Sequence, residues 1–166
     1  SGSVIISTVE GTRPMLLELQ ALVAPTNFGM ARRTSTGVDF NRVALLLAVL
    51  EKRIGLQIQN QDVYINVVGG IKINEPSIDL GIVIAVASSF RNIPIASDVV
   101  VTGEVGLTGE IRAVSYIEKR IAECKKLGFK KIVIPRNNYE AVKDVKGIEI
   151  IPVDNLRQAI NIVLRG

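Results

Sequence analysis

The segment from Pro76 to about Phe90 constrains the fold more than any other part of this 166-residue chain. It predicts a helix whose residues are apolar around most of its circumference rather than along one stripe. A helix of this kind is not stable on a surface, so the fold has to bury it centrally and pack other elements around it.

Strand and helix patterns differ on the two sides of this central helix. Before it, strand patterns follow one another, whereas after it strands and helices alternate. This order predicts an α+β domain, a two-layer α/β arrangement. The expected strands cover residues 4–9, 15–23, 63–68, 99–101, 111–114, 131–134 and 148–151, and the expected helices cover residues 40–53, 115–127, 139–145 and 154–164.

Local signals set the helix starts and the longest loop. Asp39, Ser115 and Asp154 precede three of the expected helices and have the short oxygen-bearing side chains that favour the N-cap position. Residues 24–39 are rich in proline, threonine, glycine and arginine, so they are expected to form a loop.

The length of the chain fits one domain with a core of its own. We expect a single domain over residues 4–166, and Ser1-Gly2-Ser3 reads as a cloning remnant. The strand pattern begins almost at once, which suggests a domain cut from a longer protein. Only 4% of the residues are aromatic, so the core is expected to consist of Ile, Val, Leu and Ala.

The chain has no histidine and one cysteine, Cys124. These counts exclude histidine-dependent triads and dyads, histidine-ligated zinc, an intrachain disulfide and a four-cysteine metal site. A single cysteine fits a cytosolic protein, and Cys124 is expected to be a small core residue on a helix. No apolar run reaches the roughly 18 residues that a membrane span needs, so no membrane partner is expected.

Ser77 is the candidate nucleophile, because it follows a proline at the start of the central helix. The free N–H groups of a helix start can stabilise an oxyanion, but the same position also suits a plain helix cap. A serine needs a base to become a nucleophile, and without histidine only a lysine or a carboxylate is available.

The net charge of +4 is unevenly distributed along the chain. Two basic clusters favour contact with a polyanion, although a solvated helix face is the alternative for each. The first cluster comprises Arg32, Arg33, Arg42, Lys52 and Arg53, and the second comprises Lys119, Arg120, Lys125, Lys126, Lys130, Lys131 and Arg136. Tyr64, Tyr116 and Tyr139 are scattered, so phosphate contact without base readout is expected rather than stacking on single-stranded bases.

The stretch Thr102-Gly103-Glu104-Val105-Gly106-Leu107-Thr108-Gly109-Glu110, followed by a helix and by an aliphatic strand that ends at Pro135, resembles the proteolytic domain of the Lon protease family. The resemblance implies the Lon proteolytic-domain fold, which is similar to domain 2 of ribosomal protein S5. It places Ser77 on the nucleophile and Glu118 on the catalytic lysine, while Lys119 lies about 100° further around a helix. The catalytic pair is therefore expected to be degenerate, and this chain is not expected to be an enzyme.

Several segments in the same order also resemble the C-terminal Lon-like domain of the RadA (Sms) family of bacterial recombination and repair proteins. They include Glu10-Gly11-Thr12-Arg13-Pro14, Ala31-Arg32-Arg33-Thr34 and residues 45–53. This resemblance implies a cytoplasmic, nucleoid-associated parent that forms a hexamer and promotes branch migration as a DNA-dependent ATPase, using ATP, magnesium and zinc. This chain carries no phosphate-loop motif and no cysteine finger, so no cofactor or metal is expected to bind it.

The implied roles of the chain are hexamer scaffold and duplex-DNA contact, with recombination proteins such as a RecA-type recombinase as further partners of the parent. The expected DNA-binding residues are Arg32, Arg33, Arg42, Lys52 and Arg53. Two alternatives remain open at this point, a peptidase that uses Ser77 and Lys119, and a pure oligomerisation module without DNA binding.

Overall fold

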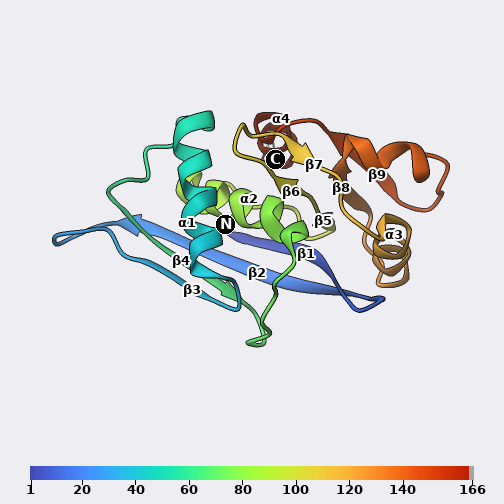
Figure 1. Cartoon of the computed structure of the whole chain (residues 1–166), viewed down its shortest axis with the longest axis horizontal. Coiled ribbons are helices and arrows are strands. Elements are labelled where there is room, and N and C mark those ends of the chain that lie inside the picture. Colours follow the sequence, from blue (N-terminus) through green and yellow to red (C-terminus); the bar gives the residue numbers. More distant parts are fainter. Residues whose placement is uncertain (165–166) are drawn as a thin grey trace.

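The computed structural model describes residues 1–164, which form a mixed sheet with helices packed on it (Figure 1). Within that range the main sheet has seven strands in the order β3-β4-β2-β1-β5-β8-β9, and a two-stranded hairpin, β6-β7, stands apart from it. The strands are β1 (Ser3–Glu10), β2 (Arg13–Pro25), β3 (Arg33–Thr36), β4 (Gln61–Val67), β5 (Val99–Val101), β6 (Glu104–Val105), β7 (Ile111–Arg112), β8 (Lys131–Pro135) and β9 (Glu149–Val153).

The strands around β1 differ in how they pair on its two sides. β1, β2 and β4 pair antiparallel, whereas β1, β5, β8 and β9 pair parallel. Parallel neighbours need a crossover connection, and helices supply it in the second half of the chain. The helices are α1 (Phe40–Val49), which continues as a π-helical turn (Leu50–Ile54), α2 (Asp79–Arg91), α3 (Ile117–Lys126) and α4 (Leu156–Val163), with 3₁₀ turns at Pro76–Ile78 and Arg136–Ala141.

The predicted central position of α2 is confirmed, since every residue from Asp79 to Ser89 is buried. Gly81 lets the helix lie directly on β1, because a Cβ atom at this position would come 2.3 Å from a methyl group of Ile6. The close approach fixes where α2 starts relative to the sheet, and with it the position of Ser77.

Alternate residues of the central strands face two separate apolar clusters. Ile6, Val101 and Val133 pack with α1, α2 and α4 on one face of the sheet. On the other face, Val100 and Ile132 pack with the buried residues of α3, among them Cys124. The predicted α+β class is confirmed, and α3 adds cover to the second face. Burial raises the pKa of the Cys124 thiol to about 12, as expected for a core cysteine.

Three local predictions are wrong. The predicted loop over residues 24–39 contains β3, which pairs parallel with β4. Ser115 does not cap α3, which is preceded instead by Tyr116 in the left-handed conformation with φ 56°. Asp154 does not cap α4; the cap is Asn155, whose side chain accepts a hydrogen bond from the N–H of Gln158.

The predicted helix over 139–145 is also displaced, because the structure has a 3₁₀ turn at Arg136–Ala141. Tertiary pairing outweighs the local propensity at β3, and a neighbouring residue with better cap geometry does so at the start of α4.

The first residues of the chain are part of the sheet. Gly2 donates its N–H to the hydroxyl of Ser88 at 2.8 Å, and its carbonyl accepts from the N–H of Ala21 at 2.8 Å. Whether Ser1-Gly2-Ser3 is a cloning remnant stays a prediction. Over residues 1–164, no helix has the length and apolar character needed to cross a bilayer.

Candidate functional site

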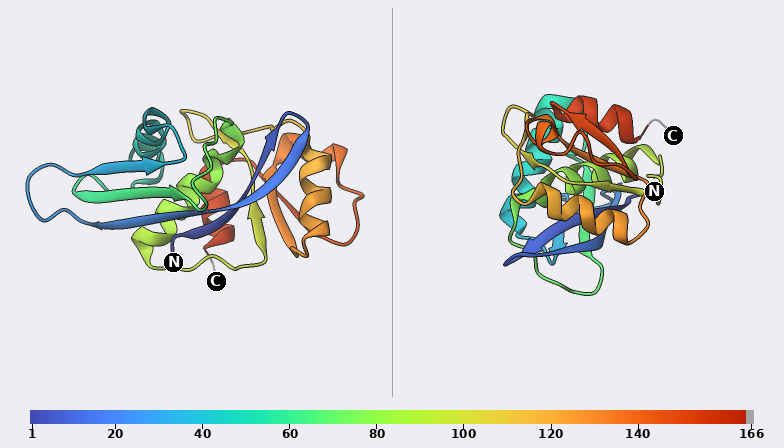
Figure 2. Two further views of the ribbon diagram at one scale, coloured as in Figure 1. Left: turned by 90° about the horizontal axis from the view of Figure 1, so that it is seen from below. Right: turned by 90° about the vertical axis from the view of Figure 1, so that its right-hand side faces the viewer.

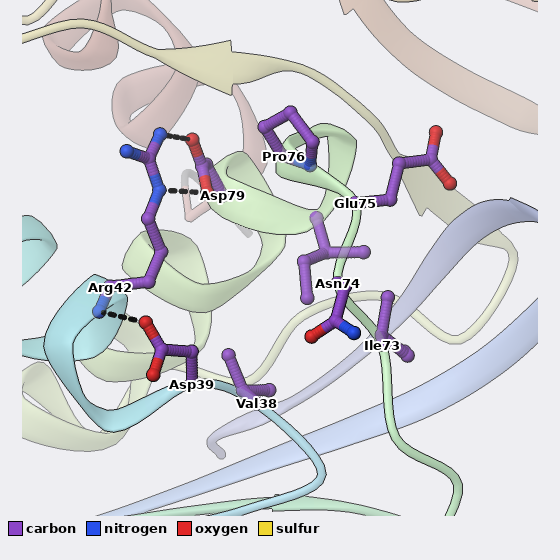
Figure 3. Close-up of a pocket in the computed structure, with 9 residues that line it drawn as sticks. Val38, Asp39, Arg42, Ile73, Asn74, Glu75, Pro76 and Asp79 are labelled. Carbon is purple, nitrogen blue, oxygen red and sulfur yellow. Dashed lines mark hydrogen bonds and ion pairs between the residues drawn. The ribbon is translucent and has the colours of Figure 1, made fainter.

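The start of α2 lies beside a hollow of about 340 Å³ on the side of the sheet that carries α1 and α2 (Figure 3). The hollow separates the start of α1 from the extended segment that leads into Pro76. It is lined by Val38, Asp39, Arg42, Ile73, Asn74, Glu75, Pro76, Ile78 and Asp79.

Ser77, the predicted nucleophile position, does not open into this hollow. Its side chain is only 2% exposed. The hydroxyl donates to the carbonyl of Ser7 at 3.2 Å and accepts from the guanidinium of Arg120 at 3.2 Å. The serine oxygen is therefore held inside the protein by two hydrogen bonds, one to β1 and one to α3.

Arg120 is the residue of α3 that faces Ser77, and it is completely buried. Its guanidinium donates to the carbonyls of Ser115 at 2.8 Å and Ser7 at 3.0 Å, and it forms an ion pair with Glu75. An arginine has five N–H donors, accepts no hydrogen bond and stays protonated, so it cannot act as the base that a serine nucleophile needs.

Glu75, which is partly buried, completes this network. Its carboxylate also accepts from the N–H of Val9 at 2.6 Å and from the hydroxyl of Thr8 at 2.8 Å. Burial acts to raise the pKa of Glu75, but these hydrogen bonds and the Arg120 guanidinium together outweigh it and leave the pKa below its usual value. We call Ser7, Glu75, Ser77 and Arg120 the Arg120 network.

Glu118, predicted to occupy the catalytic lysine position, is exposed on α3. Lys119 is exposed as well, and its ammonium donates to the carbonyl of Thr12 at 3.2 Å. Neither side chain is in the Arg120 network. Sequence reasoning missed Arg120, which it counted in the second basic cluster. The signal was available, since Ile117, Arg120, Ile121 and Cys124 follow the i, i+3, i+4, i+7 spacing of a buried helix face.

A second ion pair joins α1 to the first residue of α2. Asp79 is fully buried, and its carboxylate accepts from Nε of Arg42 at 3.0 Å and from a second guanidinium nitrogen of the same residue (Figure 3). It also accepts from the N–H of Val105 in β6 at 3.1 Å. A carboxylate in the first turn of a helix is favoured by the helix dipole. We call Arg42, Asp79 and Val105 the Asp79 clamp.

Arg42 differs from the other expected DNA-binding residues, because its guanidinium already forms an ion pair with Asp79 inside the protein. Arg33 is partly occupied too, since it donates to the carbonyl of Ile58 at 2.7 Å and lies 3.8 Å from Glu51. That contact brings the start of β3 beside the π-helical turn that carries Lys52 and Arg53. Arg32, Lys52 and Arg53 are exposed.

The hairpin β6-β7 carries the motif that resembles the Lon family. Gly106 leaves room there for the carboxylate of Glu110, whose carboxyl carbon would lie 2.2 Å from a Cβ atom at position 106. The Glu110 carboxylate accepts from the hydroxyl and the N–H of Thr108 and from Arg112. The hydrogen bond from the hydroxyl of Thr108 is the main reason why the pKa of Glu110 is lowered to about 2. The turn follows Val105, whose N–H donates to Asp79 within the clamp.

The low pKa of Glu110 predicts an acid-sensitive turn. Its stabilising effect is complete above the unfolded-state pKa of about 4.5 and is lost as the pH falls towards about 2. In a carbon-detected NMR titration we expect the Glu110 carboxyl to titrate near pH 2, and Thr108→Ala to move its midpoint upward. A midpoint near 4.5 in the parent protein would contradict this.

The described residues contain no group of three or more His, Cys, Asp or Glu side chains placed to hold a metal ion. The arrangement at the start of α2 is thus one of two ion pairs and a buried hydroxyl, and its evident chemical role is to fix α1, α2, α3 and β6 relative to one another.

Comparison with known proteins gives consistent matches. Residues 47–166 match the family described as Lon protease (S16) C-terminal proteolytic domain. The chain is similar to the DNA repair protein RadA of Bacillus subtilis (strain 168), with 55% identity over 166 residues, which is 100% of this chain and 36% of that protein. It is 52% identical over 164 residues to the DNA repair protein RadA of Halalkalibacterium halodurans, covering 99% of this chain and 36% of that protein.

A third relative, the DNA repair protein RadA of Listeria monocytogenes serovar 1/2a, is 51% identical over 160 residues, which is 96% of this chain and 35% of that protein. The chain therefore spans little more than a third of the length of these curated relatives.

Proposed function

This chain belongs to the family of the Lon protease C-terminal proteolytic domain, and from that membership we propose that it is a non-proteolytic member that contacts duplex DNA and supports ring assembly in a DNA repair protein. The single observation that carries the loss of proteolysis is the Arg120 network. It buries the hydroxyl of Ser77 and places a permanently protonated arginine where a base would be needed.

The alternative peptidase that uses Ser77 and Lys119 has no support in the geometry. Lys119 is exposed and bonded to Thr12, whereas Ser77 is buried under Arg120. A nucleophile and its base have to lie within hydrogen-bonding reach of each other. We therefore favour a structural role for this domain in the parent protein over a catalytic one.

Three exposed cations support the DNA contact. Arg32, Lys52 and Arg53 lie around the contact between Arg33 and Glu51, at the start of β3 and the end of α1. Phosphates are bound by such side chains without base readout, and the binding falls steeply with salt. We leave Arg42 out of the proposed contact because the Asp79 clamp occupies it.

For the parent protein we propose the wider roles that the resemblance to the RadA family implies, namely a hexameric ring that acts in recombination and branch migration, with a RecA-type recombinase as a partner. ATP, magnesium and zinc would act elsewhere in such a protein. The residues described in this chain offer no metal-ligand cluster, so we assign no cofactor to this domain.

The DNA contact is tested by the double variant Arg32→Ala/Lys52→Ala. Neither side chain forms an internal ion pair among the described residues, so the fold should be retained. We expect duplex binding to weaken at every salt concentration, and the slope of log K against log salt to become shallower by about 2, since about one counterion is released per phosphate contact.

Lys125→Ala/Lys126→Ala on α3 is the matched control, because it removes the same charge from exposed positions elsewhere. If Arg32→Ala/Lys52→Ala binds duplex DNA as tightly as the Lys125→Ala/Lys126→Ala control at all salt concentrations, the assigned contact is wrong. If the parent chain forms rings by light scattering yet shows no duplex binding at low salt, the chain is an assembly module without a DNA role.

A further inference from the structure

The loop between β2 and β3 exposes two large apolar side chains that the fold does not use. Phe28 is 92% exposed and Met30 is 89% exposed. Among the described residues, no other large apolar side chain is exposed by more than the 60% of Leu107. Large apolar side chains that are exposed close together, rather than singly, are candidates for an interaction site.

The loop is fixed at its base and free at its tip. Thr26 donates its N–H to the carbonyl of Asn60 and its hydroxyl to Asp62, and the N–H of Arg32 also donates to Asp62 at 2.8 Å. Between these anchors, Gly29 has φ 67° and no atom within 4 Å of a Cβ built on it. The loop forms one end of the molecule along its longest axis and projects beyond α1 (Figure 1, Figure 2).

The shape of the tip favours insertion over docking on a broad surface. A stable protein interface buries roughly 800 Å² on each partner, which two side chains flanked by Asn27 and Arg32 cannot supply alone. Proteins that deform duplex DNA commonly insert Phe, Leu, Ile or Met between adjacent base pairs and partly unstack them. The exposed tip is narrow enough for this role.

The charge around the tip favours nucleic acid as the occupant. Residues 26–36 contain Arg32 and Arg33 and no acidic residue. Arg32 lies two residues from Met30 and is exposed, so it can reach a phosphate while the tip meets the bases. Asp62, an acid at the base of the loop, is engaged by the anchoring hydrogen bonds there.

We propose that Phe28 and Met30 form an apolar wedge that enters between adjacent base pairs of duplex DNA while Arg32 contacts the flanking phosphate. The wedge rests on the proposed function, since it requires that this face of the domain meets DNA. It adds that the DNA is locally unstacked at the point of contact, as in a bent or opening duplex. The scattered tyrosines play no part in it.

The test uses this chain and short duplexes that carry 2-aminopurine, whose fluorescence rises when it is unstacked. We expect the parent to raise the fluorescence on binding. Phe28→Ala/Met30→Ala should abolish the rise and lower affinity by about tenfold, in line with the loss of one stacked or inserted contact. Phe28→Trp should preserve the rise, because it keeps a large flat apolar side chain.

Leu22→Ala is the matched control, because Leu22 is an exposed apolar residue (59%) on the sheet and not on the loop. If the tip variant still unstacks the DNA while Arg32→Ala/Lys52→Ala weakens binding, the wedge is wrong and the DNA contact stands. If the parent binds no duplex, the proposed function fails and the wedge fails with it. If the tip variant loses only self-association, the tip meets a second copy and the wedge is wrong.

Discussion

Arg120→Met is expected to lower the free energy of unfolding by about 3–5 kcal/mol, the usual effect of removing one partner of a buried ion pair. The methionine fills most of the space but donates no hydrogen bond. It leaves the carboxylate of Glu75 without its cation and the carbonyl of Ser7 with only the hydroxyl of Ser77 as a donor. Urea unfolding followed by circular dichroism measures the loss.

Lys119→Met is the control, because it replaces an exposed cation on the same helix by methionine. It should change the free energy of unfolding by less than about 1 kcal/mol. The double variant Glu75→Gln/Arg120→Met should be more stable than Arg120→Met alone, because it removes the uncompensated charge. If Arg120→Met costs no more than Lys119→Met, the Arg120 network does not hold α3 to β1.

The pH dependence of stability provides a second test of the Arg120 network. The pKa of Glu75 is lowered in the folded protein, so its ion pair contributes stability above the usual carboxyl pKa and loses it as the pH falls. In Arg120→Met, protonation of Glu75 instead relieves an unpaired charge. The stability difference between parent and variant should therefore narrow below about pH 4.5.

The elements that could be predicted from sequence are those with strong apolar periodicity. The burial of α2 followed from its apolar circumference, and the α+β class followed from the order of the strand and helix patterns. β3 could not be predicted in this way. Its sequence Arg-Thr-Ser-Thr has no apolar alternation, and its strand conformation comes from parallel pairing with β4.

The contacts of the candidate site depend on residues that the resemblance did not point to. The resemblance led to Ser77 and to α3, and the residue that meets the serine is Arg120 instead of Glu118. The reason is geometric, since positions 118 and 120 lie about 200° apart around a helix and only one can face inward. The helical spacing indicates that Arg120 is buried, but its partners could not be inferred from sequence, because they lie on distant segments.

Arg42→Met is expected to cost about 3–5 kcal/mol of unfolding free energy, because it leaves the fully buried carboxylate of Asp79 with a single backbone donor, the N–H of Val105. The ion pair is the main cause of a raised Arg42 pKa, so the arginine is held more firmly as a cation in the folded protein. The change should act on stability rather than on DNA affinity, since the guanidinium is already neutralised within the clamp.

The same variant therefore separates the two roles that Arg42 could have. Unfolding by urea should show the large loss, and the folded variant should keep the salt slope of duplex binding seen in the parent, whereas a phosphate contact would make it shallower by about 1. Asp79→Asn added to Arg42→Met should recover part of the lost stability, because an amide removes the buried charge while its oxygen still accepts from Val105. If Arg42→Met is as stable as the parent and its slope of log K against log salt is shallower, Arg42 contacts DNA. The same result would show that apolar packing alone holds α1 to α2.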